Sequence, residues 1–191
     1  DTRRMVSGGD DGTVRLWDLT GTRPPTVLRG HQGAVGAVAF GPNGRRVASS
    51  GDDGTVRLWD VTGARPPAIL SGHRGQVRTL VFSRDGRRLA SAGNDGTVRL
   101  WDVTGNSPPM VLTGHQGIPG GVAFSPDGRW LSSGGDDGTV RLWPTTISSE
   151  PVVFDGFGTS VESTAFSPDG RLLATTAGDG KLQYRLAVND T

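Results

Sequence analysis

The sequence predicts an all-β fold built from repeated units, each containing four short antiparallel strands. A nine-residue segment, DDGTVRLWD at 10–18, returns three times with no more than one substituted residue in each copy. The tryptophans of these four copies follow one another at intervals of 42 residues: Trp17, Trp59, Trp101 and Trp143. A fixed period of this length is typical of a repeat array. Short β-type runs fill each period, and none has apolar residues at helical spacing.

Each nine-residue copy predicts a hairpin turn that leads into a strand. The Asp-Gly pair favours a type I′ turn, in which both central residues have positive φ. In the strand that follows, Val14 and Leu16 point to one face, and the residues between and beside them point to the other. Both faces carry bulky side chains, so we expect other sheets to cover both.

Three further strands complete the unit. In the second unit, the run at 34–40 is followed by a GPNG turn at 41–44 and a strand at 45–50. Proline, then Asp or Asn, then Gly predicts a turn that a left-handed glycine closes. A Pro-Pro loop after each tryptophan leads to a short strand that ends in Gly-His, as at 26–31. Pro119 stands at the start of a first strand, which predicts that this strand is an edge.

Four strands per period, with Gly-His early and Trp-Asp late in the unit, resemble the WD40 repeat. The resemblance implies β-propeller blades of four antiparallel strands, arranged radially around a channel. The array is expected to contain about 4.5 repeats: a partial blade at 1–30, blades at 31–72, 73–114 and 115–156, and a partial divergent blade at 157–191. We interpret it as a segment of a larger propeller. The alternatives are a small ring with imperfect end blades and an oligomer that completes the circle.

Composition restricts the possible functions. A formal net charge of +1 argues against a strongly electrostatic partner such as bulk nucleic acid. Cysteine is absent, so disulfides and thiolate metal sites are excluded. Paired aspartates recur, but the further oxygen ligands of a calcium loop do not accompany them, so no metal or other cofactor is expected. With no signal peptide or membrane-length apolar run, we expect a cytoplasmic protein. Arginine almost entirely replaces lysine, which suggests a bacterial source.

Serine, histidine and aspartate recur together with each tryptophan, which raises the question of catalysis. A hydrolase places one such set in one cleft, whereas here the set repeats with the period. The WD40 resemblance implies instead a buried hydrogen-bond chain in each blade. It would consist of His31, Ser49, Asp53 and Trp59; of His73, Ser91, Asp95 and Trp101; and of His115, Ser133, Asp137 and Trp143. The last unit keeps Thr175 and Asp179 but has Phe157 and Arg185, so its chain is not expected to form.

The resemblance also indicates where a partner binds. The Gly-His loops and the Asp-Gly turns are expected on one face of the propeller, here called the acidic-turn face. The opposite face, here called the Pro-turn face, would carry the SPDG-type turns and several arginines. Peptide-contacting positions of the family correspond to Asp10, Asp52, Asn94, Asp136, Gln32, Arg74, Gln76 and Gln116. Their chemistry predicts a protein or peptide partner with polar or basic character.

We therefore expect a non-catalytic interaction scaffold, part of a larger signalling or regulatory protein. The alternative is a hydrolase or small-molecule binder that uses the central channel, although the expected first strands carry mostly small or aliphatic residues. Nucleic-acid binding through the arginine-rich face lacks interleaved aromatic residues. Self-association through the end blades is a further expectation, because exposed sheet edges favour pairing with another chain.

Overall fold

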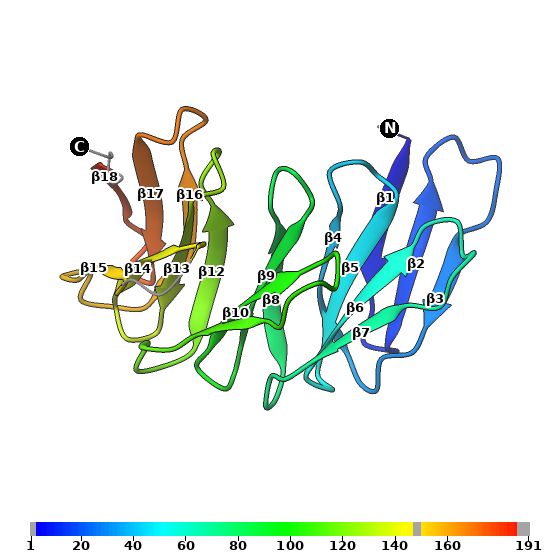
Figure 1. Ribbon diagram of the computed structural model, residues 1–191, viewed down its shortest axis with the longest axis horizontal. Helices are drawn as coiled ribbons and strands as arrows, with labels where there is room; N and C mark the ends of the chain where they lie inside the picture. Colours follow the sequence, from blue (N-terminus) through cyan, green and yellow to red (C-terminus); the bar gives the residue numbers. More distant parts are fainter. Residues whose placement is uncertain (1–2, 147–149, 187–191) are drawn as a thin grey trace.

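The computed structural model describes residues 3–146 and 150–186, and its regular structure in these ranges is entirely β (Figure 1). Sheet 1 contains β1 (Arg4–Gly8), β2 (Thr13–Asp18) and β3 (Thr26–Arg29). Sheet 2 contains β4 (Val35–Phe40), β5 (Arg46–Gly51), β6 (Thr55–Asp60) and β7 (Ala68–Ser71). Sheet 3 contains β8 (Val77–Phe82), β9 (Arg88–Gly93), β10 (Val98–Asp102) and β11 (Met110–Leu112).

Two more sheets follow in the same order. Sheet 4 contains β12 (Pro119–Phe124), β13 (Trp130–Gly135), β14 (Val140–Pro144) and β15 (Val152–Phe154). Sheet 5 contains β16 (Val161–Phe166), β17 (Leu172–Ala177) and β18 (Leu182–Leu186). Every strand pairs antiparallel with its sequence neighbour in the same sheet. Over the described residues, no helix is long and apolar enough to cross a membrane.

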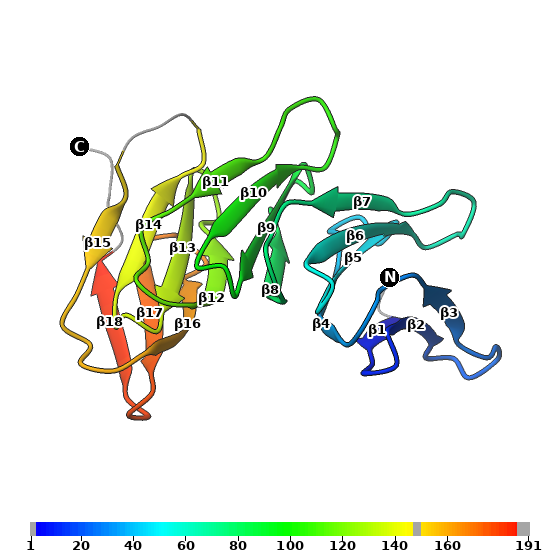
Figure 2. The same cartoon turned by 90° about the horizontal axis from the view of Figure 1, so that it is seen from below.

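The five sheets follow one another along an open arc (Figure 2). The first strands of successive sheets, β4, β8, β12 and β16, contact one another and lie along the concave side of the arc. The outer strands β7, β11 and β15 lie on the convex side. The predicted all-β, four-stranded WD40-type architecture is therefore confirmed, as an arc and not as a closed ring.

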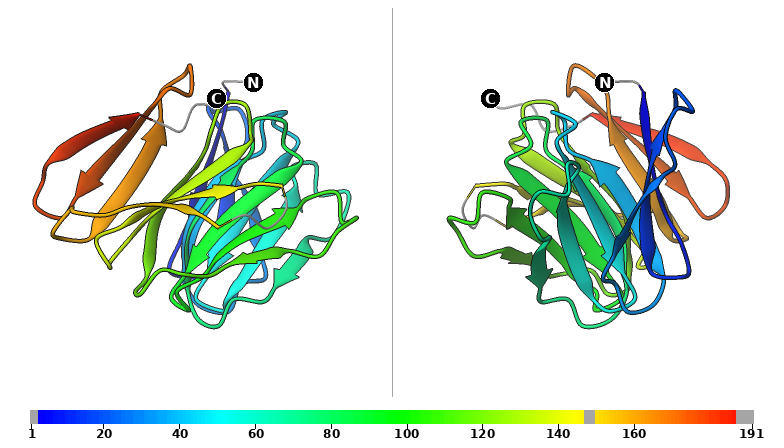
Figure 3. Two further views of the ribbon diagram at one scale, coloured as in Figure 1. Left: turned by 60° about the vertical axis from the view of Figure 1, so that its left-hand side comes forward. Right: turned by 90° about the vertical axis from the view of Figure 1, so that its right-hand side faces the viewer.

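Neighbouring sheets bury their facing side chains against one another. Val56 and Leu58 of sheet 2 form one apolar cluster with Leu89 and Trp101 of sheet 3. The same relation joins sheets 1 and 2, 3 and 4, and 4 and 5. The expectation that both faces are covered is thus confirmed for the three inner sheets. Sheets 1 and 5 each have a neighbour on one side only (Figure 3).

The turn before each third strand differs from the expected type I′ hairpin. The amide of Gly54 donates to the carbonyl oxygen of Gly51 at 3.2 Å, which makes Asp52 and Asp53 the central pair. Gly54 follows with φ of +72°. A type I turn followed by a left-handed glycine leaves both aspartates in ordinary conformations. The prediction was wrong because it placed the aspartate at a positive-φ position that only the glycine occupies.

Two other local predictions are confirmed. The turn at 41–44 is closed by a hydrogen bond from the Gly44 amide to the Gly41 carbonyl at 2.8 Å, and Gly44 has φ of +66°. Pro119 begins β12, which is an edge strand of sheet 4. Its pairing with Gly135 precedes a register shift, so the missing amide hydrogen interrupts little of the ladder.

Candidate functional site

A chain of four side chains crosses sheet 2 from its buried interior to one end. Trp59 Nε1 donates to Ser49 Oγ at 2.7 Å, and Ser49 Oγ lies 2.7 Å from His31 Nε2. His31 Nδ1 lies 3.1 Å from each carboxylate oxygen of Asp53. Sheets 3 and 4 repeat the arrangement with all corresponding distances between 2.8 and 3.1 Å, through His73, Ser91, Asp95 and Trp101 and through His115, Ser133, Asp137 and Trp143.

The donor inventory fixes the direction of this chain. An indole N–H only donates, so Ser49 Oγ accepts from Trp59, and its own proton points to His31 Nε2. The carboxylate of Asp53 only accepts, so the proton of His31 lies on Nδ1. Each imidazole is therefore neutral and serves as both acceptor and donor. In this way every buried polar group of the Trp–Ser–His–Asp chain is paired.

The aspartates that end the three hydrogen-bond chains remain ionised. Burial alone would raise the pKa of Asp53, but hydrogen bonds from the Gln32 amide, from Thr55 and from His31 outweigh it and lower the pKa to about 2. The same balance lowers the pKa of Asp95 and Asp137 to about 2. Three or more donors on one carboxylate stabilise the charged form strongly.

The pKa values of the three network histidines are shifted in the direction that keeps the imidazoles neutral. Burial lowers the pKa of His31, and the nearby Asp53 carboxylate, which favours the protonated form, only partly opposes this. His73 and His115 have lowered pKa values for the same reason. The three side chains are almost fully enclosed, so a proton gained by the imidazole would place a second charge inside the sheet.

A glycine that sequence reasoning missed makes room for each imidazole. A Cβ atom on Gly51 would lie 2.6 Å from His31 Nδ1, and one on Gly93 would lie 2.6 Å from His73 Nδ1. Both distances are too short for any side chain. The signal was present in the sequence, since glycine stands two residues before the network aspartate in each of these copies.

Arginines in the third strands were also missed. Arg57 Nη2 lies 3.7 Å from Asp53 Oδ2, and the guanidinium groups of Arg99 and Arg141 lie over the rings of Trp101 and Trp143, 5.9 Å from the ring centroids. These contacts place a permanent positive charge beside each His–Asp pair. The arginine of every TVRLW segment, between two buried apolar residues, was the available signal.

The end sheets depart from the pattern. In sheet 1, Trp17 Nε1 donates to Ser7 Oγ at 2.9 Å, while Asp11 receives hydrogen bonds from Thr13 and Arg15. In sheet 5, Phe157 takes the place of the histidine and is buried in the apolar cluster with sheet 4. The hydroxyl of Thr175 is buried and has no hydrogen-bond partner among the described residues. The side chain of Arg185 lies outside the described part.

The repeated Ser-His pairs have triad-like distances, but their surroundings do not suit nucleophilic catalysis. Ser49, Ser91 and Ser133 have no exposed surface. Each Oγ already accepts the indole proton, so no position remains for a substrate carbonyl next to it. Among residues 3–146 and 150–186, no three His, Asp or Glu side chains come together as metal ligands would.

The structure places seven of the eight candidate partner-binding residues on the exposed surface. Asp10, Asp52, Asn94 and Asp136 are exposed in the turns, and Gln32, Arg74 and Gln116 are exposed after the Gly-His pairs, whereas Gln76 is half-buried. Each exposed turn residue from the second copy onward precedes a network aspartate, which is held by its own hydrogen bonds.

Two of these candidates are brought together across a sheet boundary. Gln76 Nε2, at the start of sheet 3, donates to Asp52 Oδ1 of sheet 2 at 2.6 Å. Within sheet 3, Arg78 Nε donates to Asn94 Oδ1 at 2.6 Å. Arg78 was not predicted, because the equivalent position holds glycine in two other copies and glutamate in the last. No hydrogen bond of the described residues involves the carboxylate of Asp10 or Asp136.

Four-stranded sheets stacked along an arc, each inner one crossed by the same Trp–Ser–His–Asp chain, define a β-propeller repeat protein. The sequence profile of the WD domain, G-beta repeat, matches residues 1–18, 22–60, 64–102, 106–144 and 149–184. The five matches cover most of the sequence, so the chain belongs to the WD40 repeat family. No curated protein matches it.

Proposed function

We propose that the chain is a non-catalytic scaffold that docks a basic or polar peptide on its acidic-turn face. WD40 repeats are in general protein-interaction scaffolds. The supporting observation is the row of exposed turn residues at one position in consecutive sheets. Asp52 and Asp136 lie directly before aspartates whose carboxylates are fixed, so their backbone positions are pre-organised. A pre-organised row of acceptors binds a cationic peptide with little loss of conformational entropy.

The larger setting that we propose is a cytoplasmic signalling or regulatory protein of bacterial origin, for which the support is compositional. Within the face, the Asp52 carboxylate is held by Gln76, so a peptide lysine or arginine would replace or share that amide. Asp136 needs no such exchange. We therefore assign the stronger contribution to Asp136.

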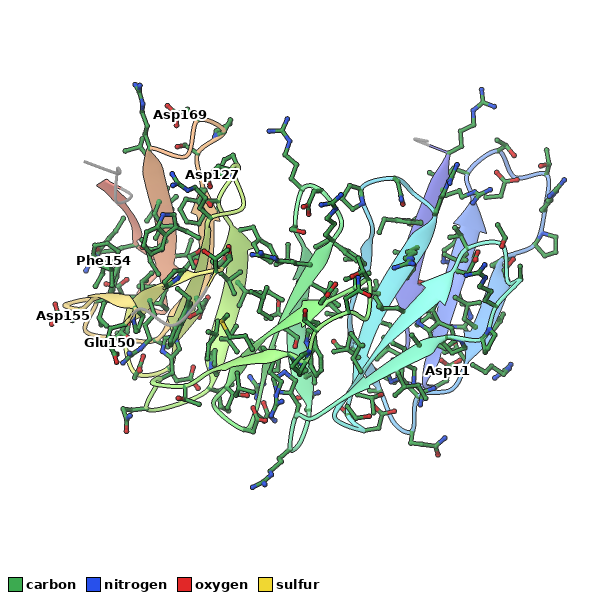
Figure 4. The ribbon with its side chains drawn as sticks, viewed as in Figure 1. Asp11, Asp127, Glu150, Phe154, Asp155 and Asp169 are labelled. Atoms are coloured by element: carbon green, nitrogen blue, oxygen red, sulfur yellow. The ribbon has the colours of Figure 1, made fainter. Side chains whose placement is uncertain are left out.

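Fluorescence anisotropy with a labelled peptide of alternating Lys and Ser tests this proposal at about physiological ionic strength. The double variant Asp52→Lys with Asp136→Lys is expected to weaken binding at least about tenfold, because two attractive contacts become repulsive. Asp127→Lys with Asp169→Lys makes the same charge change in two turns of the Pro-turn face, where Figure 4 labels both residues, and should change binding much less. Equal losses in the two double variants, or no binding to the unmodified chain, would contradict the proposal.

A further inference from the structure

The Pro-turn face contains two neighbouring grooves, one at each boundary of sheet 3. The first, of about 570 Å³, lies between sheets 2 and 3 and is bordered by the turns at 41–43 and 84–86. The second, of about 480 Å³, lies between sheets 3 and 4 and is bordered by the turns at 83–85 and 126–129. Arg84 and Asp85 line both grooves, so the turn of sheet 3 forms the ridge between them.

The grooves are predominantly basic. Three aspartates, Asp60, Asp85 and Asp127, line them together with six arginines: Arg45, Arg46, Arg84, Arg87, Arg88 and Arg129. The whole chain has a formal net charge of only +1, so this excess is a local feature of the surface. A concave surface lined by one sign of charge attracts ligands of the opposite sign.

The aspartates in the grooves are directed into their own turns. Asp85 Oδ1 accepts from Ser83 Oγ at 2.6 Å and from the Arg87 amide at 3.0 Å. Asp127 makes the same two contacts with Ser125 and with the amide of Arg129. These hydrogen bonds hold one oxygen of each carboxylate inside its own turn, and the three aspartates offset only part of the positive charge of the six arginines.

Five of the six arginines divide into two groups. Arg46 Nη1 donates to the carbonyl of Val103 at 3.0 Å, and Arg88 Nη1 donates to the carbonyl of Thr145 at 2.8 Å, so these two join neighbouring sheets. Arg45, Arg84 and Arg87 are exposed, and no hydrogen bond or ion pair within the described residues involves their guanidinium groups. Three unpaired guanidinium groups thus line the two adjoining grooves.

Arg84 is the exception in a repeated turn. The three equivalent positions hold proline: Pro42, Pro126 and Pro168. The turn is closed by a hydrogen bond from the Gly86 amide to the Ser83 carbonyl at 2.9 Å, which puts residue 84 at the position where proline favours the turn. Arginine at position 84 lacks proline's preference for this turn conformation, but it adds a guanidinium group on the ridge between the grooves.

We propose that these two grooves bind an acidic peptide segment, with Arg84 as the central contact and Arg45 and Arg87 on either side. The fork of N–H donors in arginine matches the geometry of a carboxylate. A nucleic acid fits less well, because three aspartates interrupt the basic surface and the one aromatic side chain that lines it, Phe82, is half-buried and cannot serve as a stacking platform. This site lies opposite the acidic-turn face. It would take an acidic partner, whereas the acidic-turn face would take a basic or polar one.

The decisive variant is Arg84→Pro, which converts SRDG into the SPDG turn that the same chain already uses at 125–128. The probe is a fluorescein-labelled peptide of alternating Glu and Gly, measured by anisotropy. We expect Arg84→Pro and Arg87→Gln each to weaken binding at least about fivefold, and added salt to weaken the remaining binding further. Arg29→Gln, which removes an exposed arginine at the end of β3 in sheet 1, is the matched control and should leave the affinity unchanged.

Two results would overturn the proposal: Arg84→Pro binds the glutamate peptide as tightly as the unmodified chain, or the unmodified chain does not bind it. Tighter binding of oligothymidine than of the peptide, with the same loss in Arg84→Pro, would show instead that the grooves take phosphodiesters. The Lys-Ser peptide separates this site from the acidic-turn face. Arg84→Pro should bind that peptide normally, so either proposal can fail while the other stands.

Discussion

His31 contacts Asp53 symmetrically: the Nδ1 atom of the imidazole lies 3.1 Å from each oxygen of the carboxylate. His31 precedes the first strand of sheet 2, whereas Asp53 lies in the turn between the second and third strands. Their contact therefore fastens two loops at one end of the sheet. The same carboxylate accepts the Gln32 amide at 3.0 Å and the Thr55 amide at 3.0 Å, so a single side chain orders both loops.

Replacement of a network aspartate is expected to destabilise the protein by about 1–3 kcal/mol. In Asp95→Ala, the buried Nδ1 proton of His73 loses its acceptor, and so do the amides of Arg74 and Thr97. Urea denaturation followed by tryptophan fluorescence measures the loss. A neutral result would mean that the hydrogen-bond chain does not contribute to stability.

Asp179→Ala is the matched control for this prediction. Asp179 occupies the equivalent turn in sheet 5, where it accepts hydrogen bonds from the amide and the amino group of Lys181, and the histidine position holds Phe157. Its loss should destabilise the protein much less, since exposed ion pairs contribute little. If Asp95→Ala and Asp179→Ala shift the midpoint equally, the effect belongs to the turn and not to the buried chain.

Truncation of a network tryptophan should cost more than loss of the aspartate. Trp101 is only 4% exposed and packs against Val56 and Leu58 of the preceding sheet, so Trp101→Ala should destabilise by about 3–5 kcal/mol through cavity formation. Trp17 has the same repeat position but is half-buried on the uncovered side of sheet 1. Thermal melts should therefore show a clearly smaller shift for Trp17→Ala, and equal shifts would contradict the packing argument.

The repeat period was sufficient to predict the sheets. The order of residues along the buried chain came from the resemblance to the WD40 repeat, and the period then located its copies, since Ser49, Asp53 and Trp59 recur 42 residues later as Ser91, Asp95 and Trp101. The turn type was missed because Asp-Gly can be the central pair of a type I′ turn or the last two residues of a type I turn that a left-handed glycine closes. The hydrogen bond from Gly54 to Gly51, which distinguishes them, involves a glycine outside the pair.

The candidate binding surface was less predictable, for a physical reason. The hydrogen bond from Gln76 to Asp52 crosses between two sheets, and its formation depends on their rotation along the arc. A repeat period gives the place of a residue within its sheet but not the side chains that reach it from the next one. The same holds for Arg46 and Val103, whose contact joins the Pro-turn side of sheet 2 to sheet 3.

The stability of the protein should fall on acidification in two stages. Burial lowers the folded-state pKa of His31, His73 and His115, so below the unfolded-state value of about 6.5 the unfolded chain takes up more protons and stability decreases. Asp53, Asp95 and Asp137 have pKa values lowered to about 2, and their contribution is lost as the pH falls from about 4 towards 2. Urea midpoints from pH 8 down to about pH 2 measure both stages.

His115→Phe isolates the first stage. Phenylalanine already occupies the equivalent place in sheet 5, where Phe157 is buried. The variant should be less stable at pH 7, because Ser133 and Asp137 lose their partner, but its midpoint should depend less on pH between about 6.5 and 5. An unchanged slope in this range would show that the histidines do not cause the decrease.

Each end face of the arc leaves apolar side chains uncovered, and from this we predict self-association of the 191-residue chain. At the inner boundaries, Val56, Val98 and Val140 are fully buried against the next sheet, whereas Leu182 at the same position in sheet 5 is 53% exposed. In sheet 1 the uncovered face is the one that, in an inner sheet, packs against the preceding sheet. On this face Trp17 is half-buried and Met5 is 47% exposed. Contact of the Leu182 face with the Trp17 face of a second copy would repeat an inner boundary, in a head-to-tail arrangement.

Light scattering after size exclusion should therefore show a molar mass that rises with concentration, and Leu182→Lys should shift the chain towards the monomer. Ile69 is also 53% exposed but lies on the outer strand β7, away from both end faces, so Ile69→Lys should leave the association unchanged. A monomer at every concentration would contradict the head-to-tail contact. Equal effects of the two variants would attribute association to general surface hydrophobicity, because only Leu182 occupies the position that is buried at each inner boundary.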